Sequence, residues 1–403
     1  MMSYWRAARR ILCVRLDNMG DVLMTTPAMR ALKQSGTDRH LTLLTSSSAA
    51  RLAPYLNMVD DVWAYDAPWV KHAATSTSEA DLSMIDKLRA GRFDAAVIFT
   101  VYSQSPLPAA MMCRLAGIPL RLAHCRENPY ALLTERIVES EPHAGTRHEV
   151  VRQLALVQSV GALASDERLG FDVQRQDRHA ISELLATAGN RRACGRWLVI
   201  HPGASAPSRR WPAERFAQAG AQLANDFDGI AVTGSHEEHA LVAAVCARIG
   251  KKALPLAGAL SLGKLAALIE RADLLVANNT GPVHIAAAVG TPVVDLYALT
   301  NPQHRPWQVP HRVLNVDVPC RNCYRSECAV PGHPCLTGVS PDAVLAAARH
   351  LLSCAVPRET SPVAPLRTPA QGPRSPGPVS SATRNVHPDP LKEPMICRRL
   401  HHR

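Results

Sequence analysis

Apolar positions in the first half of the chain fall into short runs separated by longer segments with helical spacing. Runs at 11–16, 41–46 and 94–101 are typical of buried strands, whereas apolar residues recur every three to four positions at 22–35 and 106–117. Strands that alternate with helices form βαβ units, in which helices cover both faces of a parallel sheet. We therefore predict an α/β fold.

The same alternation starts again near residue 197. The segment 196–203 is typical of a strand that ends in a turn, and 212–227 is typical of a helix with a proline near its first turn. This renewed succession predicts a second α/β unit. We place the boundary near residue 190, which gives Rossmann-like domains at 1–190 and 191–356.

The last segment, 357–403, has a different character. It is rich in proline, serine and arginine and has almost no apolar periodicity. Such a segment cannot bury enough apolar surface to offset the entropy lost on ordering. We predict that it is a disordered tail.

The net charge of +11 raises the question of a nucleic-acid partner. The tail carries eight Lys and Arg against three Asp and Glu, so +5 of the +11 lies there and +6 remains for the two domains. Aromatic residues make up only 4% of the chain, whereas single-stranded nucleic acids are bound on aromatic platforms. The charge therefore favours anionic substrates or peripheral contact with a membrane surface over nucleic acid.

No apolar run reaches the roughly 18–20 residues that a membrane-spanning helix needs. The basic start of the chain is followed by only four apolar residues before Arg15, without a small-residue cleavage site, which disfavours a signal peptide. We expect a cytoplasmic protein, in contact with the cytoplasmic face of the inner membrane if with any membrane. Its cysteines should be reduced unless they bind metal.

Three polar clusters each follow a predicted strand. The first contains Asp17, Asn18 and Asp21, and the others occupy 201–210 and 278–284. In paired α/β domains, ligands bind between the domains at the carboxyl ends of the strands. We expect the functional residues in these three clusters.

The second cluster has the composition of a phosphate-binding loop. Small residues lead to the start of a helix, whose amides and dipole attract anions. Ser205 and Ser208 carry hydroxyl donors, and Arg209 can form two parallel hydrogen bonds with a phosphate. A solvated loop before an ordinary helix is the structural alternative.

The third cluster combines a helix cap with free backbone amides. Asn279 and Thr280 can cap the following helix, while the amides from Thr280 and Gly281 onward can bind an anion. His284 lies on the first helical turn. This position is equally compatible with a histidine packed in the core and with one that contacts a bound ligand. The two functions are compatible, because a side chain that caps the helix leaves other backbone amides free to bind an anion.

The first cluster presents carboxylates where a phosphate loop is usual. Asp21 follows Gly20 at a helix start and can accept a proton from an attacking hydroxyl. Stabilisation of the helix dipole by Asp21 is the alternative reading. Arg15 and Asn18 are candidates on the acceptor side of the same turn.

Together the three clusters resemble glycosyltransferase family 9, the ADP-heptose-dependent heptosyltransferases of lipopolysaccharide assembly. The matching segments are RLDNMGDVLMTTPAMRAL, HPGASAPSRRWPAERF and NNTGPVHIAAAVGTPVVDLYALTNPQHRPW, which occur in the family's order. The resemblance implies a GT-B fold, with two Rossmann-like domains and a donor nucleotide held mainly by the second. It also implies inverting sugar transfer to a glycolipid or glycan acceptor, without a catalytic cofactor.

The resemblance also suggests roles for particular residues. Asp21 corresponds to the catalytic base, Arg209 to a basic residue on the donor phosphates, and Thr280 and Gly281 with His284 to the turn facing the pyrophosphate. Asn279 departs from the aspartate common in the family. An acidic residue that contacts the donor nucleoside corresponds to Glu237 or its neighbour Glu238. The last helix, which starts at a Ser340 cap, is expected to pack back toward the first domain.

Several functions stay open within this resemblance. A protein-modifying heptosyltransferase, a GT-B nucleotide-sugar epimerase and an inactive binding relative all share the two-domain plan. On the acceptor side, the loops at 66–80 and 102–130 carry basic residues that can meet an anionic glycolipid. These candidates are Lys71, Arg114, Arg121 and Arg126.

Four cysteines near the end of the second domain have metal-ligand spacing. Cys320, Cys323, Cys328 and Cys335 form C-x2-C-x4-C-x6-C, whose first pair is the knuckle of tetrahedral thiolate sites. We predict a structural zinc or iron ion there. Unmetallated thiols and two disulfides are the alternatives.

Overall fold

The computed structural model describes residues 2–70, 77–188 and 195–354. The chain divides into two units, Met1–Pro357 and Arg358–Arg403. The second unit, which contains the predicted disordered tail, lies outside the described residues, as does Lys71.

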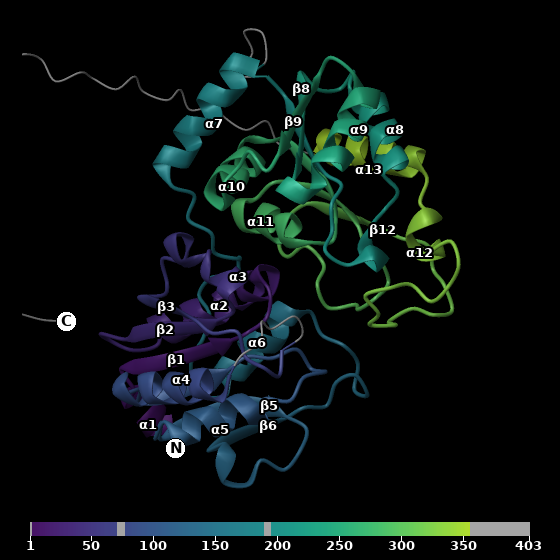
Figure 1. The fold of residues 1–403 in the computed structure, drawn as a ribbon. Coiled ribbons are helices and arrows are strands. Elements are labelled where there is room, and N and C mark those ends of the chain that lie inside the picture. The colour runs from purple at the N-terminus through teal and green to yellow at the C-terminus, as the bar shows by residue number, and fades with distance from the viewer. Residues whose placement is uncertain (1, 71–76, 189–194, 355–403) are drawn as a thin grey trace, which may run out of the picture. The chain divides into compact units, whose positions relative to one another are not determined.

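The first sheet has six parallel strands in the order β3-β2-β1-β4-β5-β6 (Figure 1). Alternate side chains of β1 enter opposite hydrophobic layers, because Ile11 packs with the core on one face and Leu12 with the core on the other. Both faces must therefore be covered by helices. The strands are β1 Arg10–Arg15, β2 His40–Thr45, β3 Asp61–Ala64, β4 Ala95–Ile98, β5 Leu120–Cys125 and β6 Glu135–Val138. The helices are α1 Met2–Ala7, α2 Met19–Gln34, α3 Ser47–Ala50, α4 Ser78–Ala90, α5 Leu107–Leu115 and α6 Glu149–Gln158, with short η1 Ala53–Tyr55 and η2 Tyr130–Leu132.

The second sheet repeats this plan in the order β12-β11-β10-β7-β8-β9, again with every pair parallel. Val199 and Ile200 of β7 enter opposite layers in the same way. The strands are β7 Trp197–His201, β8 Gly229–Gly234, β9 Ala253–Ala257, β10 Leu274–Asn278, β11 Val293–Leu296 and β12 His311–Leu314. The helices are α7 Arg175–Ala188, α8 Ala213–Leu223, α9 His239–Ile249, α10 Leu262–Arg271, α11 Gly281–Val289, α12 Pro334–Thr337 and α13 Pro341–Cys354, with η3 Pro207–Arg209 and η4 His236–Glu238.

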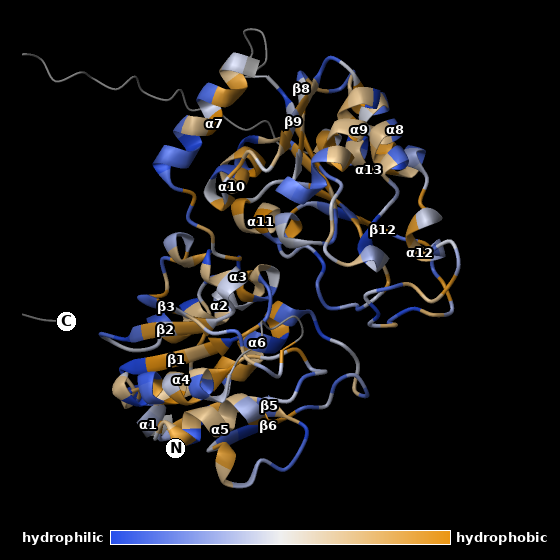
Figure 2. Cartoon of the chain, viewed as in Figure 1, coloured by the Kyte–Doolittle hydropathy of each residue, from blue (hydrophilic) through white to orange (hydrophobic). Residues whose placement is uncertain are grey.

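Hydropathy follows this layering. Figure 2 shows apolar strands within each sheet and polar residues along the outer helical faces and loops. Within the described residues, no helix combines the length and the apolar character that crossing a membrane requires. The fold class predicted from the sequence, two parallel α/β units, is confirmed.

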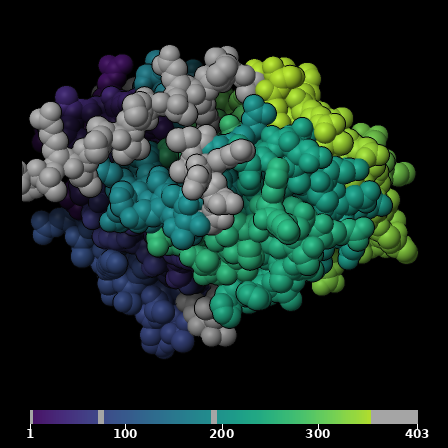
Figure 3. All heavy atoms as spheres, turned by 90° about the horizontal axis from the view of Figure 1, so that it is seen from above, coloured from purple at the N-terminus to yellow at the C-terminus, as the bar shows by residue number. Residues whose placement is uncertain are grey.

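The packing of the last helix corrects one expectation. The Ser340 hydroxyl caps α13 by accepting a hydrogen bond from the Ala343 amide at 3.2 Å, as predicted. However, α13 packs on helix α8 and on strands β11 and β12, all in the second half of the chain, and not toward the first domain. Figure 3 shows the yellow residues of α13 beside the teal and green residues of that half.

The candidate clusters follow β1, β7 and β10. In the first sheet, β1 lies where the strand order reverses, and in the second sheet β10 and β7 are the two strands at the reversal. Loops at such reversals leave a crevice at the carboxyl ends of the strands. The topology thus places all three clusters where α/β folds bind ligands. The boundary near 190 stays a prediction, although α7, which precedes it, packs on α10 of the second half.

Candidate functional site

The turn after β1 is built around a buried guanidinium group. Arg15 is completely buried, and its three nitrogens reach three carboxylates: Asp17 at 3.0 Å, Asp21 at 3.2 Å and Glu149 at 2.8 Å. Glu149, on the first turn of α6, is also completely buried and accepts a hydrogen bond from Gln153 at 2.6 Å. One cation therefore contacts three acidic groups at this turn.

Asp21 uses one carboxylate oxygen on its own helix and the other on Arg15. Its Oδ2 accepts a hydrogen bond from the Asn18 amide at 3.2 Å and so caps the start of α2. Its Oδ1 lies 3.2 Å from Arg15 and 3.9 Å from His304 Nε2, and the side chain is 14% exposed. Burial raises the pKa of Asp21, the Arg15 charge opposes this, and the Glu149 charge raises it further. A carboxylate with a raised pKa is a better proton acceptor than an ordinary aspartate.

Two histidines of the second half approach this turn. A Cβ on Gly20 would lie only 2.8 Å from His284 Cδ2, so glycine permits α2 and α11 to meet closely. Burial lowers the pKa of His284 to about 3 and that of His304 to about 4. Both imidazoles are therefore neutral near pH 7, and each has a buried nitrogen without a hydrogen-bond partner among the described residues.

Arg209 supplies an unpaired positive charge near the same place. Its side chain is half-buried and forms no hydrogen bond or ion pair with the described residues. Its charge nonetheless lowers the pKa of Asp21, after the larger effects of burial and Arg15, and also that of His304. A half-buried cation without a partner is a fitting contact for an anionic ligand.

The loop that carries Arg209 is tied to β10. Asn278 is completely buried, accepts a hydrogen bond from the Trp211 amide at 2.9 Å and donates to the Pro202 carbonyl at 2.8 Å. The second and third clusters are thereby joined. Ser205 is exposed and available, whereas Ser208 is buried and donates to the Arg325 carbonyl at 2.7 Å.

The start of α11 offers fewer backbone amides than the third cluster suggests, because Pro282 has no N–H group and the Val283 amide donates to the Thr280 carbonyl at 3.0 Å. Thr280 is the N-cap residue, and Gly281 is the first helical residue, with no other atom within 4 Å of where a Cβ would lie. The Asn279 side chain turns away from this end, because it donates to Asp295 and to the His304 carbonyl, both at 2.9 Å. Asn279 thus holds the loop that carries His304.

The two acidic residues after β8, Glu237 and Glu238, differ in their surroundings. Glu237 is exposed, and its pKa is lowered by its own backbone amide and the Ser235 hydroxyl. Glu238 packs against Gly203, where a Cβ would lie 2.0 Å from its Oε1. Glu238 therefore lies against the Arg209 loop, and its Oε2 accepts a hydrogen bond from the Ser235 amide at 2.8 Å.

The structure shows how the described acceptor-side candidates are held. Arg15 is completely buried behind its carboxylates, so it orients them and has no exposed surface for an acceptor. Asn18 is exposed at the turn. Arg121 and Arg126 donate to backbone carbonyls, among them those of Leu132 and Glu141, each at 2.7 Å. Arg114 likewise donates to the Ala131 carbonyl at 3.1 Å. These arginines brace loops, and the sequence could not reveal that use.

The cysteine segment does not form the predicted metal site. Cys320, Cys323, Cys328 and Cys335 are all free thiols, the first and third exposed and the last buried. Among the described residues, no group of three or more His, Cys, Asp or Glu side chains could hold a metal ion. A structural zinc or iron is therefore not supported. The segment does contact the Arg209 loop, since the Ser208 amide donates to the Ser326 carbonyl at 3.0 Å.

Two residues central to this site were missed by sequence reasoning. Glu149 lies 134 positions from Arg15, and nothing in its local pattern indicates a buried charge. His304 lies within the third matching segment but was not singled out. The contact between His304 and Asp21 is seen only in the folded structure. The position of a histidine in the loop after β11 was nevertheless a sequence feature that could have marked it as a site candidate.

Known proteins resemble the chain over most of its length. A family model described as glycosyltransferase family 9 (heptosyltransferase) matches residues 82–333, which is more than half of the chain. Lipooligosaccharide heptosyltransferase 2 of Campylobacter jejuni is 25% identical, the match covering 51% of this chain and 64% of that protein. Lipopolysaccharide heptosyltransferase 2 of Salmonella typhimurium is 24% identical over 85% of this chain and 99% of that protein. The structure of Escherichia coli ADP-heptose lipopolysaccharide heptosyltransferase II superposes with a TM-score of 0.66, covering 85% of this chain and 98% of that one at 21% identity.

Proposed function

The chain belongs to glycosyltransferase family 9, and from this membership we propose that it transfers heptose from ADP-heptose to a lipopolysaccharide-core or related glycan acceptor. The names of the relatives support this substrate class, and the solved E. coli relative is described as an ADP-heptose enzyme. Asp21 precedes the segment that the family model matches, so its role rests on the local geometry.

In this proposal Asp21 is the general base. The acceptor hydroxyl attacks the anomeric carbon of the heptose from the face opposite the diphosphate, which inverts the configuration. Its proton passes to Asp21 Oδ1, the oxygen that is not used to cap α2. The raised pKa of Asp21, which burial causes, brings the base closer to the pH at which the enzyme works.

The leaving diphosphate gains negative charge as the glycosidic bond breaks. The unpaired Arg209 guanidinium and the Gly281 amide at the start of α11 are the groups that can stabilise this charge. Ser205 can add a hydroxyl donor. Because these groups belong to the protein, the scheme needs no catalytic cofactor.

One observation carries the proposal: an acidic side chain with a raised pKa lies near a half-buried arginine that lacks a partner among the described residues. A proton acceptor beside an anion site suits the attack of an alcohol on an activated sugar. An epimerase needs no base positioned for an acceptor, and an inactive relative has no reason to keep such a base. A protein acceptor is less favoured because the named relatives modify lipopolysaccharide or lipooligosaccharide.

The test is incubation of the purified chain with ADP-heptose, with and without a lipopolysaccharide-core acceptor. We expect ADP release that depends on the acceptor, and mass spectrometry should find one heptose added to the acceptor. Acceptor-independent conversion of the nucleotide sugar would indicate an epimerase. If ADP binds but no ADP is released with any glycan, the chain is a binding protein.

A further inference from the structure

The imidazole of His304 lies close to the proposed base. Its Nε2 atom is 3.9 Å from Asp21 Oδ1, and its side chain is 13% exposed. Arg209 is near enough that its charge lowers the pKa of this imidazole, after the larger effects of burial and Arg15. His304 is therefore near both the carboxylate that we assign to the proton and the cation that we assign to the diphosphate.

The backbone on either side of His304 is tied to the start of α6 in the first half of the chain. The Glu149 amide donates to the Gln303 carbonyl at 3.1 Å. The Nε2 atom of His148 lies 2.8 Å from the Arg305 carbonyl, which accepts its proton. These two bonds flank residue 304 and hold it against the half that carries Asp21.

The loop around His304 is also held by its own half. The Asn279 side chain donates to the His304 carbonyl at 2.9 Å, and the His304 amide donates to the Tyr297 hydroxyl at 3.2 Å. That hydroxyl in turn donates to the Asn301 carbonyl at 2.6 Å. Both ties to residue 304 use its backbone, so a substitution of the side chain leaves them in place.

The surroundings of the ring decide which nitrogen carries the proton. The side-chain nitrogen of Asn301 lies 3.3 Å from His304 Nδ1. An amide N–H group can only donate, so Nδ1 accepts and the proton of the neutral ring is on Nε2. Nε2 is buried and has no hydrogen-bond partner among the described residues. His304 thus presents an N–H donor beside Asp21 Oδ1.

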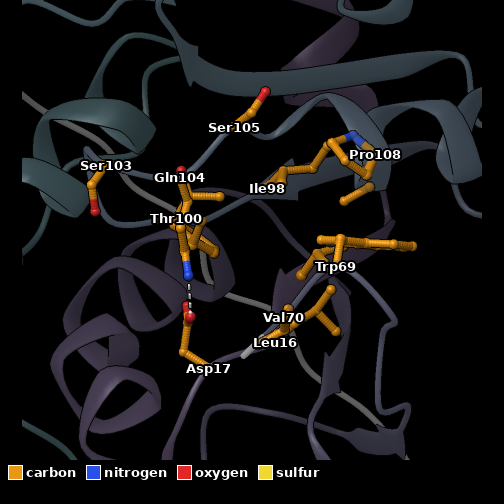
Figure 4. Close-up of a pocket in the computed structure, with 13 residues that line it drawn as sticks. Leu16, Asp17, Trp69, Val70, Ile98, Thr100, Ser103, Gln104, Ser105 and Pro108 are labelled. Atoms are coloured by element: carbon orange, nitrogen blue, oxygen red, sulfur yellow. Dashed lines mark hydrogen bonds between the residues drawn. The ribbon is translucent and has the colours of Figure 1, made fainter. Parts of the chain in front are cut away.

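The two carboxylates of the turn after β1 differ in what they can still bind. Asp17 accepts a hydrogen bond from Gln104 on Oδ1 at 2.6 Å, drawn as the dashed line in Figure 4, and its Oδ2 contacts Arg15 at 3.0 Å. Both of its oxygens are therefore engaged. Asp21 Oδ1 contacts Arg15 at 3.2 Å and has the His304 N–H group as a further neighbour. Asp21 is the carboxylate that can share a ligand atom with His304.

The distance between His304 Nε2 and Asp21 Oδ1 suits one bridging oxygen atom. At 3.9 Å it is too long for a direct hydrogen bond, which spans about 2.7–3.2 Å, but a single oxygen can bond to both atoms. A hydroxyl group there accepts from Nε2 and donates its proton to Oδ1. Its third direction is the bond to its own carbon, so the direction of the remaining lone pair is fixed. Fixing the orientation of a reacting atom lowers the barrier to its attack.

We propose that the Nε2–H group of His304 binds the oxygen of the acceptor's reacting hydroxyl and positions it against Asp21. This inference rests on the proposed function and adds a second catalytic residue to it. In the step, the hydroxyl oxygen bonds to the anomeric carbon, and the bond from that carbon to the diphosphate breaks with its electron pair on the diphosphate. The proton passes to Asp21 Oδ1, while His304 keeps its own proton throughout.

Two substitutions separate hydrogen bonding by His304 from packing. His304→Leu fills similar space without a donor, whereas His304→Gln keeps an N–H group near the place of Nε2. With saturating ADP-heptose and acceptor, kcat should fall at least about tenfold in His304→Leu and less than about threefold in His304→Gln. ADP affinity should match the wild type in both variants. The control is His179→Leu, which removes a 58% exposed histidine from α7 and should change neither quantity.

Three kinetic outcomes contradict the inference. An unchanged kcat in His304→Leu would show that the imidazole does not act on the hydroxyl. Equal losses in the leucine and glutamine variants would indicate packing, which does not depend on an N–H group. A loss of ADP affinity in His304→Leu would place the imidazole on the diphosphate instead.

NMR of the chain labelled with ¹⁵N-histidine gives a readout that needs no turnover. The signal that disappears in His304→Leu belongs to His304, and it should report the Nε2–H tautomer. With ADP present, addition of a lipopolysaccharide-core oligosaccharide should shift this signal. An Nδ1–H tautomer, or no shift, contradicts the inference. A shift without any ADP release from the wild type contradicts the proposed function and leaves the hydrogen bond standing.

Discussion

Arg15 and Glu149 form a completely buried ion pair, with Arg15 Nη1 2.8 Å from Glu149 Oε1. The same guanidinium holds Asp21, so an acidic residue on α6 controls the group that we propose as the base. The first turn of α6 is in turn connected to the second half, because the Glu149 amide donates to the Gln303 carbonyl at 3.1 Å. This chain of contacts ends one residue from His304.

The pH dependence of transfer should report on this pair. Burial raises the pKa of Asp21, Arg15 lowers it, and the Glu149 charge raises it. Activity should fall with acid as Asp21 is protonated, at a pH above the ordinary aspartate value of 3.8. Glu149→Gln removes one negative charge but keeps an oxygen for Arg15, so the acid limb of kcat/KM should move to lower pH. The exposed Glu183→Gln is the control and should leave the limb in place, and an upward shift in Glu149→Gln would contradict the assignment.

Donor affinity should depend on Arg209. Charged hydrogen bonds contribute about 1.5–3 kcal/mol each, so Arg209→Ala should weaken ADP binding by about 10- to 100-fold in calorimetry. Arg209→Lys should lose less because it keeps the charge but not the bidentate geometry. Arg248→Ala, which removes an exposed arginine from α9 in the same half, should bind ADP as the wild type does. An unchanged affinity in Arg209→Ala would remove Arg209 from the donor site.

The contact between Gly20 and His284 should show as a packing constraint. The added methyl group of Gly20→Ala would lie 2.8 Å from His284 Cδ2, and overpacking typically costs about 1–3 kcal/mol of unfolding free energy. Gly281→Ala is the matched control, since it adds the same group at a helix start with no neighbour within 4 Å. In denaturant unfolding, Gly20→Ala combined with His284→Ala should lose less stability than the two single changes added together. Additive losses would mean that the two residues do not press on each other.

Much of the fold is predictable because the hydrophobic periodicity of a segment and the turn-forming or capping residues at its ends are local properties of the sequence. The alternation of strands and helices, the placement of clusters after β1, β7 and β10, and the Ser340 cap all follow from neighbouring residues. The docking of α13 did not, because its sequence shows an apolar face but not which surface covers that face. Which half it covers depends on surfaces formed by distant segments.

The sequence predicted individual residues of the candidate site better than it predicted the contacts between them. Asp21 and Arg209 are in motifs, whereas the burial of Arg15 and its pairing with Glu149 depend on contacts more than 130 residues apart in sequence. The cysteine spacing predicted a metal site that the described residues do not form. Spacing specifies which thiols can meet, but not the contacts that this loop makes elsewhere, such as the hydrogen bond from the Ser208 hydroxyl to the Arg325 carbonyl.

Asp295 should make stability depend on pH. Burial raises its pKa to about 8, although the hydrogen bond from Asn279 acts in the opposite direction. A carboxyl whose pKa is raised in the folded state favours folding at low pH, and that contribution is lost as the pH rises toward the folded value. Relative to Asp295→Asn, the wild type should lose about 1.4 kcal/mol of unfolding free energy per pH unit between about pH 4 and 8. Parallel stability curves for the two proteins would show that Asp295 is not protonated in the fold.

The central claim is that Asp21 removes the proton from the incoming hydroxyl while the second half binds the diphosphate. It is tested most directly by the turnover of Asp21→Asn with ADP-heptose and acceptor, measured beside its ADP affinity. Asparagine keeps an oxygen that can accept the Asn18 amide but cannot take up the proton. We predict a loss of at least about 10²-fold in kcat, the lower end of what general-base catalysis typically contributes, with ADP affinity within about twofold of the wild type. A variant that turns over at a near-normal rate would contradict the account.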